Sequence, residues 1–381
     1  MRWLGLAALL LAAGCDRPRD CRAIPGDICT WAGDGHAGYD GEGNHRLQAM
    51  LYFPMYVSQS PHGPPVIDDW NNHRLRLVED DGTLTTIMGT DFVGDGPPDE
   101  ADLTPAGAPG TEVALNHPTQ HQHYADGTLL SASWHTHKLR TWDPDTGLTH
   151  VLLGNLPGFA GDEGEGDDEV RLNQPKAVAI DADDNVYIVD MRNVRVRLLT
   201  PEGAVRTIAG NGTKGDCGDG GLATEACLSF PRAENPEPGG ALAFSADETL
   251  LYIADTENHR IRVLDLETGI IDAFAGTGEP GFAGDGGDAD EAQFQYPRDL
   301  ALSPDGGTLF VADTDNHRIR AIDLDSHTVQ TVAGVGTRGF SGDESPALDA
   351  ELNRPFGISV DAEGRLYVAD TFNHRIRIVF P

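Results

Sequence analysis

The chain has 381 residues, of which 39% are hydrophobic, and 61 acidic residues against 27 basic ones give it a net charge of −34. Such a charge repels nucleic acid and anionic membrane surfaces, because affinity for phosphate depends on lysine and arginine. No internal apolar run approaches the length of a membrane helix. The composition therefore argues against nucleic acid as a partner and predicts a chain with a substantial core and an acidic surface.

The N-terminus has the pattern of a processing signal. A short basic start is followed by an apolar stretch over residues 4–13 and by small residues that lead to Cys15, which predicts a signal peptide over 1–14. The run at 11–15 resembles the bacterial lipobox, whose cysteine is lipidated, although Ala12 stands where a branched aliphatic residue is usual. The sequence predicts lipidation of Cys15, and a plain secreted protein cut nearby stays open as the alternative.

The other four cysteines form two local couples, eight and ten residues apart. An even number in an exported chain predicts disulfides, most simply Cys21–Cys29 and Cys217–Cys227. Neither spacing is that of a C-x-x-C redox motif, so the expected role of both bonds is to staple local structure.

One phrase recurs along the chain. Asp-Thr-Glu-Asn-His-Arg-Ile-Arg at 255–262 returns in similar form at 313–320 and 370–377, with weaker copies at 69–76, 133–140 and 190–197. The positions aligned with the histidine of this phrase are separated by 64, 57, 65, 58 and 57 residues. Six copies at a near-constant period predict a closed or stacked array of one structural unit.

Each copy has the pattern of an antiparallel sheet. In the last one, the runs 356–361, 365–370 and 374–380 have strand character and are separated by turns, and earlier copies add a fourth run such as 330–333. A ring of four-stranded sheets is a β-propeller, which buries both faces of each sheet.

The two ends of the chain complement each other. The last copy lacks its fourth strand, and residues 28–33 match the fourth strand of other copies. Pairing the two would complete blade six and close the ring, which removes exposed sheet edges. The expected fold is all-β: six four-stranded blades, closed by an N-terminal strand that completes the last blade.

The repeated phrase resembles the NHL repeat, named for its Asn-His-Leu-like core, and the resemblance covers residues 27–381. We therefore expect a signal peptide at 1–14, a lipidated linker at 15–26 and a single propeller at 27–381. Within each blade, the turn between the second and third strands and the long connection to the next blade should emerge on one face. Function is expected on that face, because long loops on a rigid frame usually carry it.

The repeated Asp, His and Arg residues are expected to serve blade geometry, since nearly every blade has them. Asp and Asn bond backbone amides in turns, and arginines between sheets need carboxylates, which an aspartate of a neighbouring blade can supply. The best-preserved repeat residues are Asp255, His259, Arg260, Asp313, His317, Arg318, Asp370, His374 and Arg375.

Departures from the repeat are candidates for function. Six of the 14 histidines lie between positions 117 and 150, in blade two, and alignment places His121 and His123 where blade six has Ile358 and Val360. Strand alternation points both the same way. Converging imidazoles are what zinc or another divalent transition metal needs, and packed, hydrogen-bonded imidazoles are the alternative. The candidate metal ligands are His117, His121, His123, His135 and His137.

A second candidate is the acidic loop at 161–169, where six of nine residues are acidic. Oxygen ligands on a glycine-rich frame suit calcium, although the spacing is not that of an EF-hand and a solvated loop is the simpler interpretation. The candidate calcium ligands are Asp162, Glu163, Asp167 and Asp168.

The favoured function is a binding or scaffolding module. The sequence has no G-x-S-x-G elbow, phosphate loop or H-E-x-x-H helix. NHL propellers include partner-binding domains of sensor and teneurin-like surface proteins, so the resemblance implies partner binding. With the lipobox-like run that ends at Cys15, we expect a monomer in the cell envelope, held to a membrane through its lipid. Its acidic loop-rich face would then meet a protein or a cell-envelope glycan.

The alternative is a metal-dependent lyase or hydrolase with a histidine site in blade two. The resemblance also reaches the peptidyl-amidating lyase, whose site takes histidines from different blades, whereas the extra histidines of this chain cluster in one. An inert structural spacer is the third interpretation.

Overall fold

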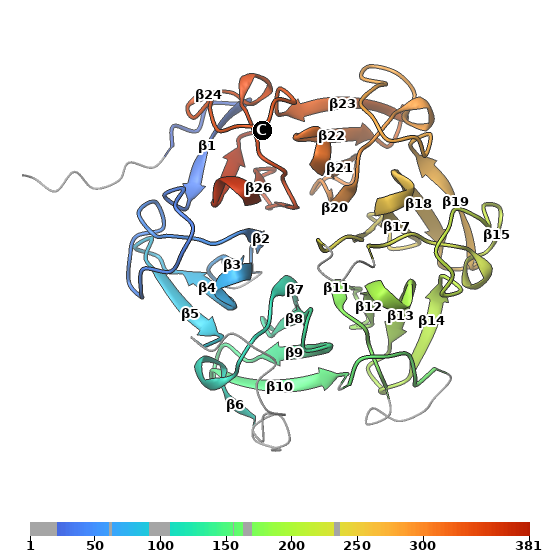
Figure 1. Cartoon of the computed structure of the whole chain (residues 1–381), viewed down its shortest axis with the longest axis horizontal. Coiled ribbons are helices and arrows are strands. Elements are labelled where there is room, and N and C mark those ends of the chain that lie inside the picture. Colours follow the sequence, from blue (N-terminus) through green and yellow to red (C-terminus); the bar gives the residue numbers. More distant parts are fainter. Residues whose placement is uncertain (1–20, 61–62, 91–106, 155, 163–169, 232–236) are drawn as a thin grey trace, which may run out of the picture.

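The structure is a computed structural model, and it describes residues 21–60, 63–90, 107–154, 156–162, 170–231 and 237–381. Within these ranges 27 strands form six antiparallel sheets, arranged as blades around a central axis (Figure 1). In the described part of the chain, no helix is long and apolar enough to span a bilayer. The chain is an all-β six-bladed propeller, as the repeat predicts.

Each blade has four main strands, which follow one another from the axis outward. Blade one comprises β2 (Pro54–Ser58), β3 (Val66–Asp69), β4 (Arg74–Val78) and β5 (Leu84–Met88). Blade two comprises β7 (Pro118–His123), β8 (Leu129–Ser133), β9 (Lys138–Trp142) and β10 (Leu148–Leu153). Blade three comprises β11 (Pro175–Ile180), β12 (Val186–Asp190), β13 (Arg195–Leu199) and β14 (Val205–Ala209). Blade four comprises β16 (Leu242–Phe244), β17 (Leu250–Asp255), β18 (Arg260–Asp265) and β19 (Ile270–Ala275). Blade five comprises β20 (Pro297–Leu302), β21 (Thr308–Asp313), β22 (Arg318–Asp323) and β23 (Thr328–Ala333). Blade six comprises β25 (Gly357–Val360), β26 (Leu366–Asp370), β27 (Arg375–Val379) and β1 (Asp27–Ala32).

Three blades carry a fifth strand that the sequence does not predict. Two-residue segments of the long connections pair with the outermost strand of blades two, four and six; they are β6 (Ala108–Pro109), β15 (Gly221–Leu222) and β24 (Ser345–Pro346). Each bonds backbone groups that would otherwise form an open sheet edge.

Strand β1 lies at the outer side of blade six. It pairs antiparallel with β27, with Ile28 opposite Val379 and Thr30 opposite Arg377, and its other edge pairs with β24. In Figure 1 the blue β1 accordingly runs beside the red strands from the far end of the sequence. Its side chains Ile28 and Ala32 are fully buried.

The core lies between the blades. Buried clusters combine side chains of adjacent sheets, as where Cys29 and Ile378 of blade six pack with Val57 and Ile67 of blade one. Because each sheet meets a neighbour on both faces, apolar residues occupy consecutive strand positions.

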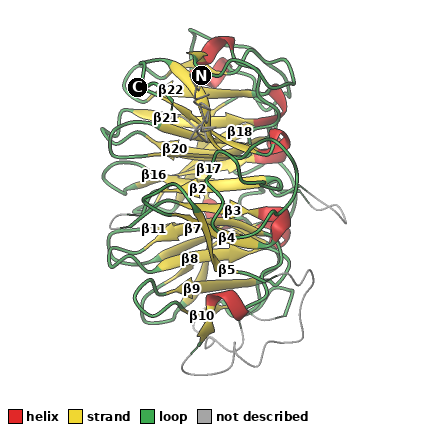
Figure 2. Cartoon of the chain, turned by 90° about the vertical axis from the view of Figure 1, so that its left-hand side faces the viewer, coloured by secondary structure: helices red, strands yellow, loops and turns green. Residues whose placement is uncertain are grey.

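A short 3-10 helix follows the second strand in five blades, and the next residue has positive φ. These turns are η1 (Trp70–Asn72), η5 (Met191–Asn193), η7 (Thr256–Asn258), η9 (Thr314–Asn316) and η11 (Thr371–Asn373). Further 3-10 helices lie in the connections between blades: η3 (Gly110–Glu112), η6 (Ala223–Glu225), η8 (Ala289–Glu291) and η10 (Ala347–Asp349). Figure 2 shows the short helices gathered along one side of the disc. We call this side the loop-rich face.

Candidate functional site

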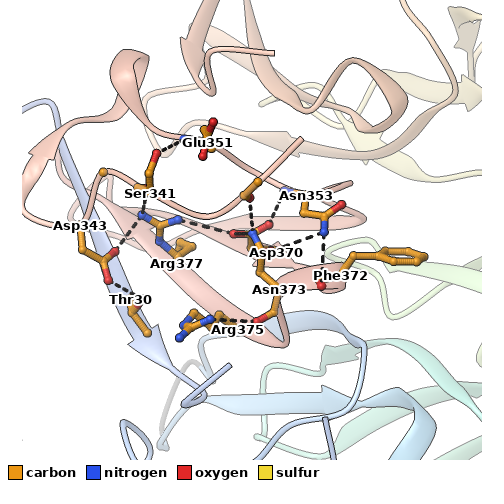
Figure 3. Close-up of polar contacts among 12 residues, drawn as sticks. Thr30, Ser341, Asp343, Glu351, Asn353, Asp370, Phe372, Asn373, Arg375 and Arg377 are labelled. Carbon is orange, nitrogen blue, oxygen red and sulfur yellow. Dashed lines mark hydrogen bonds and ion pairs between the residues drawn. The ribbon is translucent and has the colours of Figure 1, made fainter. Parts of the chain in front are cut away.

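The aspartate that five of the six repeats carry ties a turn to the chain that enters its blade. Asp370 accepts hydrogen bonds from the backbone N–H of Asn353 (2.7 Å) and from Nδ2 of Asn373 (2.8 Å) (Figure 3). Asp313 and Asp255 make the same pair of bonds in blades five and four. These carboxylates are therefore engaged in hydrogen bonds that hold each blade together.

Five of the six repeats carry two arginines with different surroundings, and blade two has Lys138 in place of the first. Arg377 is fully buried, with Nη2 2.8 Å from Asp343 Oδ1 and Nη1 3.5 Å from Asp370 Oδ2 (Figure 3). Arg375 lies 3.9 Å from the ring centroid of Phe340 and donates to a backbone carbonyl of its own turn.

The expectation that a neighbouring blade supplies the aspartate is wrong. Asp370 belongs to the same sheet as Arg377, because Asp370 pairs with Arg375 across the hairpin and Arg377 follows two residues later on the same face. Arg318 stacks on Phe282 as Arg375 does on Phe340, whereas Arg260 pairs with two aspartates of its connecting loop.

The repeated histidine links one blade to the next. His374 has φ 56°, and its Nδ1 accepts the backbone N–H of Phe53 in blade one at 3.3 Å. His317 and His259 accept backbone N–H groups of Arg354 and Tyr296 in the same way, at 3.0 and 3.2 Å. The ring nitrogen is used for the contact between blades.

His121 and His123 do point the same way, toward blade one. His121 Nε2 lies 2.5 Å from Ser58 Oγ, and its Nδ1 lies 3.0 Å from Asp68 Oδ1. His123 Nε2 reaches the same Ser58 Oγ at 2.9 Å.

This set has the connectivity of a serine–histidine–carboxylate nucleophile, but it is closed to substrate. His121 and Asp68 are fully buried, and Ser58 is 5% exposed. Catalysis requires an electrophile within reach of the nucleophile, and in this structure almost no surface of the three groups is accessible. The three groups form a chain of hydrogen bonds between blades one and two, and the second carboxylate oxygen of Asp68 is buried without a partner.

The other predicted histidines lie elsewhere. His117 and His135 meet on the loop-rich face, with their Nδ1 atoms 2.8 Å apart, and His117 Nε2 lies 3.3 Å from Asn71 Oδ1. Because two imidazole nitrogens at this distance share one proton, one of the two Nδ1 atoms donates to the other. His137 Nδ1 accepts the backbone N–H of Gln174 at 3.0 Å, the same contact between blades that His374 makes.

The five histidines are thus divided among three places and do not converge as one metal site. In the described ranges a single group of three His, Cys or acidic donors lies within 4.8 Å: Asp288, Asp290 and His327, at the edge of blade five. The aspartates of that group are exposed. The sequence pattern does not predict this group.

The acidic loop is described only in part. Asp162 pairs with Arg197 at 2.8 Å and accepts from Thr207 Oγ1 at 2.7 Å. It therefore takes the place that Asp343 has beside Arg377 in blade six. The other candidate calcium ligands, Glu163, Asp167 and Asp168, lie outside the described residues.

A cavity of about 240 Å³ opens on the loop-rich face where blades six, one and two meet. Its wall is mainly aromatic and includes Phe53, Trp70, Trp134, Phe356 and Phe372, beside His117 and His135. The rings form a continuous series: Phe372 to Phe53 at 4.8 Å, Trp70 to His117 at 4.2 Å, and Trp134 stacked on His135 at 4.2 Å between centroids. This cavity is the candidate functional site.

One carboxylate, Glu237, also lines the cavity. Arg354 binds both of its oxygens, and Arg298 Nη2 lies 3.1 Å from Oε2. Burial by itself raises the pKa of Glu237, but the hydrogen bonds and positive charges of the two arginines bring it below its ordinary value. Glu237 is thus a neutralised anion that fixes the cavity rim.

Polar side chains span the inner strands near the axis. Gln120 of blade two donates to Asp299 of blade five at 3.2 Å, and Lys176 Nζ of blade three donates to the carbonyl of Arg298 at 2.9 Å. Blades two and five lie opposite each other in the ring (Figure 1). These hydrogen bonds join blades across the axis, and the polar groups that form them are buried.

His117 and His123 of blade two should be neutral in the folded protein. Burial, followed by the charges of His73 and His135, lowers the pKa of His117 to about 3. Burial likewise lowers the pKa of His123 to about 3. In an unfolded chain histidine titrates near 6.5, so the unfolded state takes up protons first as the pH falls.

We therefore expect acid to destabilise the fold through these groups. Between pH 7 and pH 5, His117 alone should lower the free energy of unfolding by at most ~2 kcal/mol. Urea unfolding at both pH values tests this with His117→Gln, since blade three has Gln174 at the equivalent left-handed position. The variant should lose less stability than the parent over this range, and an equal loss would contradict the assignment.

Trp70 and Trp134 of the cavity wall could have been found from the sequence, because they depart from the repeat at one position. Blades four to six have threonine after the repeat aspartate, and its hydroxyl donates to a carbonyl of the next blade, as Thr371 does to Pro54. Trp70 and Trp134 stand at this position in blades one and two. Comparing that column of the repeat would have found them.

Cysteine pairing follows the prediction. The disulfides are Cys21–Cys29 and Cys217–Cys227. Such bonds indicate an oxidising, extracytoplasmic environment.

The comparisons with known proteins agree with the repeat. The NHL repeat family model matches residues 294–322 and 352–379. The chain is 30% identical over 285 residues to the protein SUPPRESSOR OF QUENCHING 1, chloroplastic, of Arabidopsis thaliana, a match covering 58% of this chain and 26% of that protein. It is 30% identical over 234 residues to human NHL repeat-containing protein 2, covering 56% and 32%, and 28% identical over 235 residues to mouse teneurin-4, covering 55% and 8%. The chain spans about a third or less of the length of these relatives.

Two solved structures from Bacteroides thetaiotaomicron have the same architecture. A protein of unknown function superposes with a TM-score of 0.66 at 18% identity, and an auxiliary nutrient binding protein with 0.62 at 15%. Each match covers 92% of this chain and 75% of the other. At this identity the likeness shows the fold. The ring of six sheets and the repeat matches together identify the chain as an NHL-repeat six-bladed β-propeller.

Proposed function

We propose that this propeller is an extracytoplasmic binding module, anchored to a membrane through lipid on Cys15, that takes its ligand into the aromatic cavity of the loop-rich face. The ligand is a free small molecule or a group carried by a protein or a cell-envelope glycan. The aromatic cavity carries the proposal, because concave sites with apolar walls and a few polar groups are the usual form of ligand sites.

Three further features support binding over catalysis. The frame uses the repeated Asp, His and Arg side chains, and the buried Ser58–His121–Asp68 set is closed to substrate. The predicted metal ligands lie in three separate places. A structural neighbour described as an auxiliary nutrient binding protein makes a binding role plausible for the same architecture.

Ligand-induced thermal stabilisation tests the site. The purified chain is screened against sugars, amino acids and aromatic heterocycles, in parallel with Phe372→Ala and Phe282→Ala. Phe372 lines the cavity, whereas Phe282 is an exposed aromatic that stacks on Arg318 in blade five. A compound that stabilises the parent and Phe282→Ala but not Phe372→Ala supports the site. The proposal fails if no compound acts, or if all three proteins respond alike.

Cell fractionation tests the anchor separately. Cys15→Ser should move the chain from the membrane fraction to the soluble envelope fraction, since one lipid-bearing cysteine is the only anchor proposed. Equal membrane association of the variant and the parent would exclude lipid on Cys15 as the anchor.

A further inference from the structure

Three side chains of metal-binding types meet at the outer edge of blade five, far from the aromatic cavity in the sequence. Asp288, Asp290 and His327 each offer one donor atom, and these atoms lie within 4.8 Å of one another. An ion held about 2.0–2.2 Å from each donor brings the donors to at most about 4.4 Å from one another. Both aspartates are exposed, so small rotations of their side chains complete the contact.

Backbone hydrogen bonds hold the two segments that carry these side chains. The connection from blade four runs along strand β23, where the backbone N–H of Ala289 donates to the carbonyl of His327 at 2.9 Å. Asp288 forms an antiparallel bridge with Thr328. Asp288 Oδ1 also accepts the backbone N–H of Asp290 at 3.1 Å. The donors therefore lie on paired backbone, which fixes their spacing.

His327 departs from the repeat at a position that is otherwise glycine. The carbonyl that accepts from the incoming connection belongs to a residue with positive φ in four blades, and His327 has φ 56°. The residues at the equivalent position in blades two, four and six are Gly147, Gly269 and Gly26. A side chain in this conformation is less favourable than glycine, so the histidine is not explained by the turn.

The two aspartates also depart from the repeat. Asp288 lies opposite the first residue of the outer strand, where blades two and four have Pro109 and Leu222. Two residues later, where blade five has Asp290, blades two and four have threonine. Three departures that converge at one place are the pattern expected of a functional site.

The carboxylates have no other cation at hand. Asp288 pairs with His327 Nδ1 at 3.7 Å, and no lysine or arginine of the described ranges forms an ion pair with Asp288 or Asp290. Asp285 in the same connection differs, because it lies 2.7 Å from Arg320 Nη2. A chain with a net charge of −34 also attracts cations to its surface.

The imidazole decides which class of cation fits. The Nε2 atom of His327 is buried, and its ring lies 5.0 Å from the ring of Phe274, so Nδ1 is the nitrogen available beside Asp288. Calcium and magnesium prefer oxygen ligands alone. One imidazole nitrogen with two carboxylate oxygens suits a divalent transition-metal ion such as Zn²⁺.

We propose that Asp288, Asp290 and Nδ1 of His327 bind one divalent transition-metal ion, whose remaining positions hold water. The ion fastens the connection that enters blade five to the hairpin between β22 and β23. In blades two, four and six the same connection forms the short strands β6, β15 and β24, whereas in blade five, which the structure describes throughout, Asp288–Thr328 is an isolated bridge.

Isothermal titration calorimetry with Zn²⁺ tests the site on the purified chain. His327→Gly removes the imidazole and restores the glycine of blades two and four, so its fold should persist, which thermal unfolding without metal verifies. Asp288→Asn removes one charge and keeps an acceptor for the N–H of Asp290. His36→Gln is the matched control, because His36 is exposed and lies 3.0 Å from a carboxylate of Asp34 elsewhere on the surface.

The parent and His36→Gln should bind Zn²⁺ with the same affinity, and His327→Gly and Asp288→Asn should bind it at least about tenfold more weakly. Changing a residue that merely supports a metal ligand costs about 10–100-fold, and loss of a ligand should cost no less. Zn²⁺ should also raise the unfolding temperature of the parent and of His36→Gln but not that of His327→Gly, since an ion that binds only the folded chain stabilises it.

Equal Zn²⁺ affinity and equal stabilisation of the parent and His327→Gly would overturn the proposal. If Asp288→Asn weakens binding while His327→Gly does not, or if Ca²⁺ displaces Zn²⁺ at equal concentration, carboxylates alone hold the ion and the assigned metal class is wrong. These outcomes are independent of the ligand screen on the aromatic cavity, because none of the variants changes a residue of that cavity.

Discussion

Deleting the chain through Gly33 should lower the free energy of unfolding by about 4 kcal/mol or more. The deletion removes β1, and with it the buried side chains Ile28, Cys29 and Ala32 and the hydrogen bonds to one edge of β27. It also removes Thr30, which donates to Asp343 beside buried Arg377. An open edge at blade six would weaken the cooperativity of the ring and promote association between molecules.

Thermal and urea unfolding of this variant are compared with a chain that begins at Asp20. Because the deletion also eliminates the Cys21–Cys29 bond, the matched control is Cys21→Ser/Cys29→Ser, which loses the disulfide and keeps the strand. The control should be clearly more stable than the deletion. Coincident unfolding curves for the deletion and the chain from Asp20 would refute closure of the ring by β1.

The architecture was predictable because it follows from periodicity. Six copies of one phrase gave the number of blades, and alternation within each copy gave its strands. The added strands β6, β15 and β24 were not predictable, since two-residue pairings depend on where a long connection passes over a sheet edge. The arginine partners were misjudged for a related reason: the distance from Asp370 to Arg377 depends on hairpin register, which puts both on one face of one sheet.

The site was only partly predictable. Alignment within the repeat correctly singled out His121 and His123 as side chains pointing the same way, but their partners Ser58 and Asp68 belong to another blade. Contacts between blades require knowing which inner strands adjoin. Glu237 lies in a connection of blade four without a counterpart in the repeat, so no alignment could place it beside Arg354.

The repeat explains why blades six, one and two carry the cavity. In blades four to six the residue after the turn aspartate is a threonine that bonds the next blade, a small side chain used by the frame. In blades one and two tryptophan replaces it, which gives up that hydrogen bond and supplies two aromatic rings to one location. A change that costs the frame a contact in adjacent blades is the pattern expected of a functional site.

Arg320→Met should destabilise the propeller by about 3–5 kcal/mol. Arg320 is fully buried, with Nη1 3.4 Å from Asp313 Oδ2 and Nη2 2.7 Å from Asp285 Oδ1. Asp313 is also fully buried, and burial raises its pKa to about 7 against the opposing effects of its hydrogen bonds and of Arg320. Removing the guanidinium leaves this carboxylate without its cation, which is the costly way to break a buried ion pair.

Arg318→Met in the same strand is the matched control. This variant loses the same charge as Arg320→Met. The guanidinium that it removes lies over the exposed ring of Phe282 and donates to the carbonyl of Val335 at 2.8 Å. Contacts of this kind contribute about 1 kcal/mol or less. Adding Asp313→Asn to Arg320→Met should recover part of the loss, because the amide keeps its size and removes the unpaired charge. Urea unfolding of the three variants measures these differences in the free energy of unfolding. Equal losses for Arg318→Met and Arg320→Met would show that the buried ion pair stabilises the fold no more than the exposed contacts of Arg318 do.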